Sequence, residues 1–89
     1  MEYEQYQRPR EKLRYAGTQA LSVRELLQII LGSGSQRASS ATIARHIEGL
    51  LTEGTMDYDT LVAIRGVGEA KACQILATCE LSLRFASRG

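Results

Sequence analysis

The sequence predicts an all-α fold of about five short helices. Apolar side chains recur every three to four residues along most of the chain, which is the spacing of one helix face. The 89 residues include a single proline and few β-branched runs, which favours helices over strands. A chain of this length forms one small domain. We place that domain at residues 8–86, with a flexible leader at 1–7 and a flexible tail at 87–89.

The first predicted helix spans residues 9–16. Pro9 suits a first helical turn and Gly17 suits a C-terminal cap, so these two residues define its ends. Basic residues alternate with other residues in this segment, at Arg8, Arg10, Lys12 and Arg14. Because a helix spreads alternate residues around its whole surface, a solvated helix is favoured over a phosphate-binding stripe.

The second predicted helix begins after Ser22. This serine is an N-cap, and Glu25 three residues later completes a capping box. The helix ends at the segment Gly32-Ser33-Gly34-Ser35. Its predicted inward residues are Val23, Leu26, Leu27, Ile30 and Leu31.

The third predicted helix begins at Ser39 or Ser40 and is stopped by Gly54. Asp57 then caps a short fourth helix that ends near Ile64. The inward residues of the third helix are Ile43, Ala44, Ile47, Leu50 and Leu51, and those of the fourth are Leu61 and Ile64.

The last predicted helix is the longest, at about 69–86. It follows a tight turn formed by Arg65-Gly66-Val67-Gly68. Val67 is expected to point into the core and fix the turn to its two helices. The inward residues of the last helix are Ala72, Ile75, Leu76, Cys79, Leu83 and Ala86.

Composition excludes several classes of protein. Eleven basic and ten acidic side chains give a net charge of +1, which rules out a bulk polycation. The apolar runs are too short to span a bilayer, and the polar, acidic N-terminus is no signal peptide. Cys73 and Cys79 lie about 9 Å apart along a helix, beyond disulfide reach, and with His46 they cannot form a structural zinc site. A reduced, cytoplasmic setting is expected. We expect His46 to lie on a helix surface and both cysteines to be packing residues.

The turn after the fourth helix is the strongest functional signal. Its glycines permit backbone angles that side chains disfavour and allow a ligand to approach the main chain. The first amides of the last helix then form a site for an anion such as phosphate. Against this, the carboxylate of Glu69 suits a helix N-terminus by itself. The predicted site consists of Gly66, Val67, Gly68, Glu69, Ala70 and Lys71.

A weaker copy of this pattern lies upstream. An offset of 34 aligns Leu27, Ile30, Gly32 and Gly34 with Leu61, Ile64, Gly66 and Gly68, and an offset of 28 aligns Ala44 and Ile47 with Ala72 and Ile75. Two such units would bury each other's apolar faces around a pseudo-two-fold axis. The upstream connection is either a flexible connector or a second anion site, consisting of Gly32, Ser33, Gly34 and Arg37.

These patterns resemble known families. The segment from Leu61 to Leu76, with Gly66-Val67-Gly68 and Ala72, resembles the helix-hairpin-helix motif, so the fold implied is a tandem helix-hairpin-helix bundle. Several further segments look like the N-terminal domain of the RadC family. They are 8–13, Ala20-Leu21-Ser22, Glu25-Leu26-Leu27, Leu31-Gly32-Ser33-Gly34, 64–71 and Glu80-Leu81. The resemblance covers residues 8–86.

The RadC resemblance implies a bacterial protein of a family named for DNA repair. Family members continue into a JAB/MPN-type domain with a metal-binding His-x-His and Asp motif. That half is absent here, so the chain is expected to be part of a longer protein or a natural short form. Any metal-dependent hydrolase activity would belong to the absent half.

The function predicted is a non-catalytic accessory module that binds the DNA backbone weakly and without sequence preference. No cofactor, metal, membrane or small-molecule substrate is expected. The alternative is a structural domain that docks a JAB-type domain or another partner. That alternative predicts an exposed apolar patch, around Tyr3, Tyr6, Tyr15 or Phe85.

Overall fold

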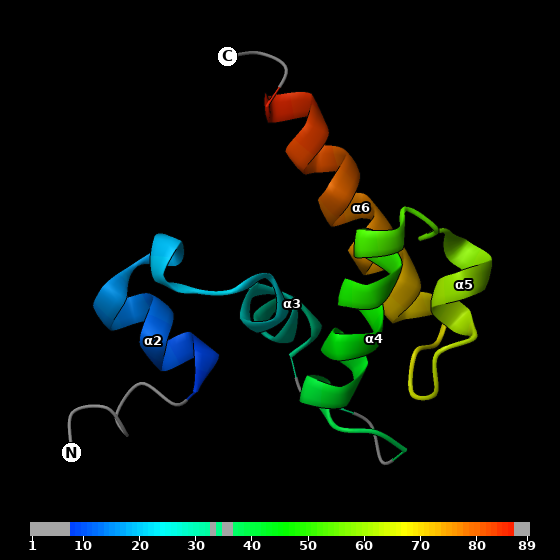
Figure 1. The fold of residues 1–89 in the computed structure, drawn as a ribbon, viewed down its shortest axis with the longest axis horizontal. Coiled ribbons are helices and arrows are strands. Elements are labelled where there is room, and N and C mark those ends of the chain that lie inside the picture. Colours follow the sequence, from blue (N-terminus) through cyan, green and yellow to red (C-terminus); the bar gives the residue numbers. More distant parts are fainter. Residues whose placement is uncertain (1–7, 33, 35–36, 87–89) are drawn as a thin grey trace.

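The computed structural model describes residues 8–32, 34 and 37–86, and within them every regular element is a helix (Figure 1). This confirms the all-α prediction. The predicted leader at 1–7 and tail at 87–89 lie outside the described residues. In chain order the elements are α2 (Pro9–Ala16), the 3₁₀ turn η1 (Thr18–Ala20), α3 (Val23–Leu31), α4 (Ser40–Glu53), α5 (Tyr58–Val62) and α6 (Glu69–Ala86).

Local caps set most helix ends where the sequence predicts them. At the start of α3, Ser22 Oγ accepts from the Glu25 amide and the Glu25 carboxylate accepts from the Ser22 amide, the predicted capping box. The Ser39 hydroxyl accepts from the Thr42 amide at the start of α4. At the other end of α4, Gly54 adopts the left-handed conformation of a C-terminal cap.

Two local features differ from the prediction. The turn η1 follows Gly17, where the sequence indicated no regular element. Helix α5 ends at Val62 rather than near Ile64. The Ile64 amide donates to the Leu61 carbonyl, three residues back, so the chain tightens into the following turn before another helical residue is added.

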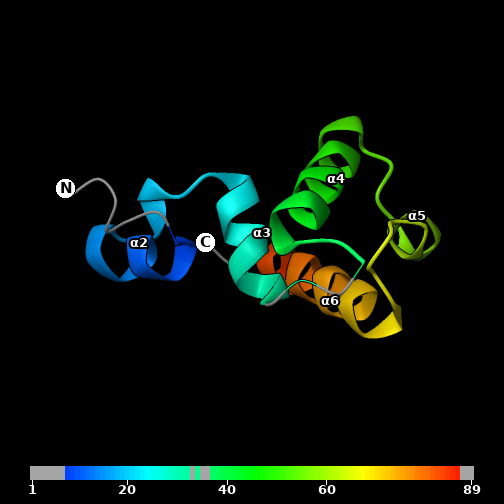
Figure 2. The ribbon, with the colours of Figure 1, turned by 90° about the horizontal axis from the view of Figure 1, so that it is seen from below.

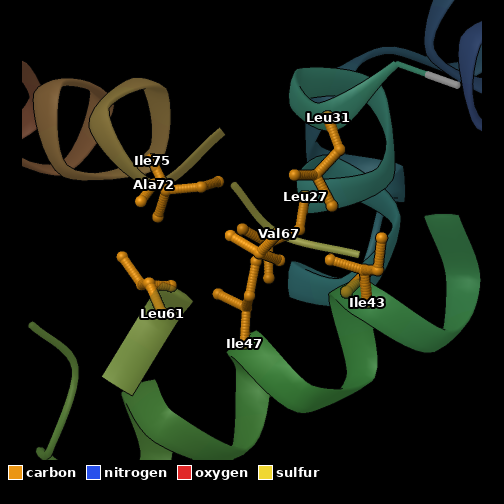
Figure 3. Packing of buried hydrophobic residues seen from close by; sticks show 9 residues of the cluster. Leu27, Leu31, Ile43, Ile47, Leu61, Val67, Ala72 and Ile75 are labelled. Carbon is orange, nitrogen blue, oxygen red and sulfur yellow. The ribbon is translucent and has the colours of Figure 1, made fainter. Parts of the chain in front are cut away.

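The core joins residues from four helices and one turn (Figure 3). Val67 lies at its centre, between α3 and α4 on one side and α5 and α6 on the other. This confirms the prediction that Val67 faces inward. The buried cluster consists of Leu27, Leu31, Ile43, Ala44, Ile47, Leu61, Val67, Ala72 and Ile75.

Some residues predicted to face inward are exposed. Val23 begins α3 and is 51% exposed, and Leu51 on α4 is 39% exposed. Leu83 is 66% exposed, and Ala86 is exposed as well. These positions have the correct helical spacing, but all four line an open groove between α3, α4 and α6 instead of packing into the core.

Helix α2 lies beside the bundle formed by the other helices (Figures 1 and 2). None of its residues is buried. Its attachment includes the ammonium of Lys12, which lies 3.2 Å from Glu25 Oε1 on α3. The buried core therefore comes entirely from the chain that follows α2.

The two proposed repeats agree in burial and backbone conformation. Gly32 and Gly66 both have positive φ, 71° and 93°, whereas Gly34 and Gly68 do not. The aligned apolar pairs also match, since both members of each pair are buried or both are half-buried. These pairs are Leu27 and Leu61, Ile30 and Ile64, Ala44 and Ala72, and Ile47 and Ile75.

Candidate functional site

Main-chain hydrogen bonds and one buried side chain stabilise the turn between α5 and α6. The Val67 amide donates to the Ile64 carbonyl at 3.0 Å, closing the turn, and the Val67 side chain is buried. The Ala72 amide donates to the Gly68 carbonyl at 3.0 Å, the first hydrogen bond of α6. The fold thus fixes both ends of the predicted site.

Gly66 and Gly68 serve different purposes. Gly66 has a φ of 93°, which side chains disfavour, so the turn itself needs glycine there. Gly68 has no positive φ, and a Cβ built on it meets nothing within 4 Å. The prediction that both glycines supply unusual backbone angles is therefore wrong for Gly68. Its open side is a place where a ligand can approach the main chain.

The N-terminus of α6 has no side-chain cap among the described residues. In α3, α4 and α5 the third helical amide donates to a side chain, which belongs to Ser22, Ser39 and Asp57 respectively. No described acceptor faces the corresponding amides of α6, those of Glu69, Ala70 and Lys71. These N–H groups carry the positive end of the helix dipole and suit an anion.

Two basic residues and one acidic residue lie next to these amides along the chain. Lys71 is half-buried in the first turn of α6, and Glu69 is exposed beside it. Arg65 is exposed directly before Gly66. None of the three forms an ion pair within the described part of the chain. Arg65 was not among the predicted site residues, although its position directly before the glycine turn was a signal for it.

The upstream turn uses its glycines for structure. Gly32 is the C-cap of α3, and its amide donates to carbonyls of the last turn. A Cβ on Gly34 would lie 2.6 Å from the Ser40 amide nitrogen, so this glycine is needed where the chain folds back against α4. Arg37 is exposed, and Ser33 lies outside the described residues.

Three of the four alternating basic residues of α2 line one groove. Lys12 differs, because it pairs with Glu25. The groove has a volume of about 460 Å³, contains one acidic residue, Glu11, and reaches the upstream turn. The expected dispersal of these charges around a solvated helix is therefore wrong in part. The lining includes Arg8, Arg10, Arg14, Gly32 and Ser40.

The candidate ligand and thiol residues lie apart. His46 is exposed on α4, as expected of a helix-surface residue. Cys73 is exposed, which corrects its predicted packing role, whereas Cys79 is half-buried against the core. Across residues 8–32, 34 and 37–86, no three His, Cys, Asp or Glu side chains gather as a metal site would require. None of the described helices combines the length and apolar character needed to cross a membrane.

A second groove is apolar. It has a volume of about 530 Å³ and lies between α3, α4 and the second half of α6. Tyr15 and Phe85 are 66% and 60% exposed, but neither lines it, and Tyr3 and Tyr6 fall outside the described residues. An exposed apolar surface is thus present, but its position differs from the one predicted from the aromatic residues.

Comparison with known proteins places the sequence in one family. The family model described as UPF0758 N-terminal matches residues 1–73. A UPF0758 protein of Clostridium kluyveri is 42% identical over 98% of this chain and 40% of its own length. For the relative from Clostridium perfringens the identity is 45%, over 89% of this chain and 37% of the relative. The chain thus spans about two fifths of the curated relatives it matches. No solved structure matches.

Proposed function

Because the chain belongs to the UPF0758 family, whose N-terminal domain it matches, we propose that it is a DNA-binding module of that family. UPF0758 is the RadC family of the sequence resemblance, which is thereby confirmed. The module binds the phosphate backbone through a helix-hairpin-helix turn at residues 66–71. It contributes no catalytic group of its own.

The open N-terminus of α6 supports this proposal most directly. Amides of Glu69, Ala70 and Lys71 have no described acceptor, and Gly68 leaves the approach to them clear. A phosphate oxygen placed there accepts from the main chain, and the Lys71 ammonium adds a charge within reach. Glu69 opposes the anion, so affinity is modest.

Contacts of this kind read the backbone and not the bases. They position a protein on DNA without specifying sequence. With two to four phosphate contacts, raising the salt concentration from about 50 to about 200 mM lowers affinity roughly 10- to 150-fold. The net charge of +1 means that a few placed groups supply this binding.

The arginine groove supports a second contact with the same duplex. Arg8, Arg10 and Arg14 form no ion pair within the described residues. Helices α4 and α6 both begin in the lower half of Figure 1 and run upwards, so the two turns that precede them lie toward one side of the molecule. The groove extends the basic surface along that side.

Fluorescence anisotropy with a labelled duplex and a branched or single-stranded DNA, across a range of salt concentrations, tests the proposal. We expect Lys71→Glu to weaken binding roughly tenfold and to lower the salt slope by about 1, with an unchanged melting temperature. Arg45→Glu is the matched control, because Arg45 is exposed on α4 and lines neither the turn nor the arginine groove. Absence of binding at about 50 mM salt, or equal losses in both variants, contradicts the proposal.

A docking role is the second candidate function. The apolar groove between α3, α4 and α6 favours it. The two roles use different parts of the surface, since none of the residues from 66 to 71 lines that groove. One chain can therefore bind DNA at its turns and a protein segment at its apolar groove.

A further inference from the structure

Among the described residues of α6, those that are fully buried lie in the first half of the helix. Its buried residues, Ala72 and Ile75, lie within the first two turns. Leu81, Leu83 and Phe85 in the last two turns are 58–66% exposed. In Figure 1 this half of the helix, coloured orange to red, extends beyond α4 towards the C-terminus.

The apolar groove runs along this extension. It begins between α3 and α4, beside Leu26 and Leu51, and reaches Leu83 and Ala86 near the end of α6. None of the described residues that line it is charged, and its surface is almost entirely apolar. A concave surface lined by apolar side chains suits a partner that presents apolar side chains, because docking removes both surfaces from water.

We propose that the groove is the docking site for the stretch of chain that follows α6 in the longer UPF0758 relatives. The matched part is N-terminal and takes up 36–40% of a relative, so about three fifths of a relative lies beyond it. A chain that continues from α6 starts at the rim of the groove, because Ala86 is one of its lining residues. The segment that binds there presents apolar side chains.

Covalent connection favours this occupant over a second copy of the chain. A segment joined by a short linker experiences an effective concentration in the millimolar range, whereas a second copy must bind at its concentration in solution. This inference does not depend on DNA binding, because the groove excludes the turn at 66–71.

The alkylation rates of the two cysteines of α6 can show whether a docked segment covers the groove. Cys79 lines the groove and is half-buried, whereas Cys73 is exposed and does not line it. The chain is joined after α6 to the downstream residues of the Clostridium kluyveri relative, and alkylation by iodoacetamide is followed at each cysteine by mass spectrometry. We expect alkylation of Cys79 to slow at least tenfold relative to the 89-residue chain, with Cys73 unchanged.

Two leucine variants separate the groove from general exposure. Leu83→Glu places a charge on the groove lining and should restore rapid alkylation of Cys79 in the extended chain. Leu81→Glu is the matched control, because Leu81 is similarly exposed on the same helix but lies outside the groove. Circular dichroism verifies that both variants fold.

Three results would overturn the proposal. The first is an unchanged rate of Cys79 alkylation in the extended chain. The second is an equal effect of Leu81→Glu and Leu83→Glu. The third is that Cys79 is protected from alkylation in the 89-residue chain alone, that this protection disappears on dilution, and that analytical ultracentrifugation detects a dimer. Such a result would assign the groove to a second copy of the chain.

Discussion

Gly66 and Gly68 lie only two residues apart but have different roles, the first in forming the turn and the second in leaving room for a ligand. Gly66 has a φ of 93° and closes the turn before α6. Gly68 occupies an ordinary backbone conformation with open space where a Cβ would lie. The requirement for glycine at 66 is therefore conformational, and at 68 it follows from the proposed approach of a phosphate.

Alanine at each position tests this division. We expect Gly66→Ala to lower the free energy of unfolding by about 1–2 kcal/mol, because alanine disfavours positive φ. Gly68→Ala should change it by less than about 1 kcal/mol and yet weaken DNA binding, because the new methyl group stands beside the open amides. Urea unfolding and DNA anisotropy measure the two effects. Equal destabilisation by both substitutions would contradict the assignment.

At the scale of the elements, one carboxylate links the first two helices. The Glu25 side chain caps α3 by accepting from the Ser22 amide at 2.9 Å, and it pairs with Lys12 of α2 at 3.2 Å. These interactions, first the hydrogen bond from the Ser22 amide and then Lys12, lower the pKa of Glu25 below its ordinary value of 4.5. Since α2 buries no residue, this carboxylate is an important part of its attachment.

The lowered pKa predicts a pH dependence. A carboxyl whose pKa is depressed by folding stabilises the fold above its unfolded value, and this contribution is lost as the pH falls through the folded value. We expect Glu25→Gln to be less stable by about 0.5–1 kcal/mol at pH 7, with the difference shrinking as the pH falls below 4.5 and through the lowered pKa of the folded state. Thermal melts across pH measure it. Glu80→Gln, from an exposed pair with Arg84, is the control and should change stability by less than about 0.5 kcal/mol.

At the scale of the whole molecule, a single core serves both repeats. Ile47 of the first repeat and Leu61 and Ile75 of the second belong to the same buried cluster, with Val67 between them. Neither repeat has enough buried surface to fold separately, so the molecule should unfold in one transition. The position of the turn that we propose to bind DNA then depends on the complete core.

A core truncation tests this dependence. Ile47 is fully buried, and Ile47→Ala should lower the free energy of unfolding by about 2–5 kcal/mol, a large share of the roughly 5–10 kcal/mol available to a domain of this size. Far-UV circular dichroism in urea measures it. Thr52→Ala, exposed on the same helix, should change it by less than about 0.5 kcal/mol. Two separate transitions would contradict the single core.

The sequence by itself determined where most helices begin and end. Ser22, Ser39 and Asp57 start helices and Gly54 stops one, as predicted, because a cap bonds to amides or carbonyls within about four residues. The inward position of Val67 was likewise evident from its place between two glycines. Family membership also followed from the order of short motifs along the chain.

Only the tertiary structure decided which surfaces remain open. Leu51 and Leu83 have the spacing of core residues, but they are 39% and 66% exposed and line a groove between α3, α4 and α6. Arg10 and Arg14 of α2, with Arg8 directly before it, line one groove because of the way α2 lies against α3. Helical spacing specifies which residues share a face, whereas burial and charge clustering depend on elements distant in sequence.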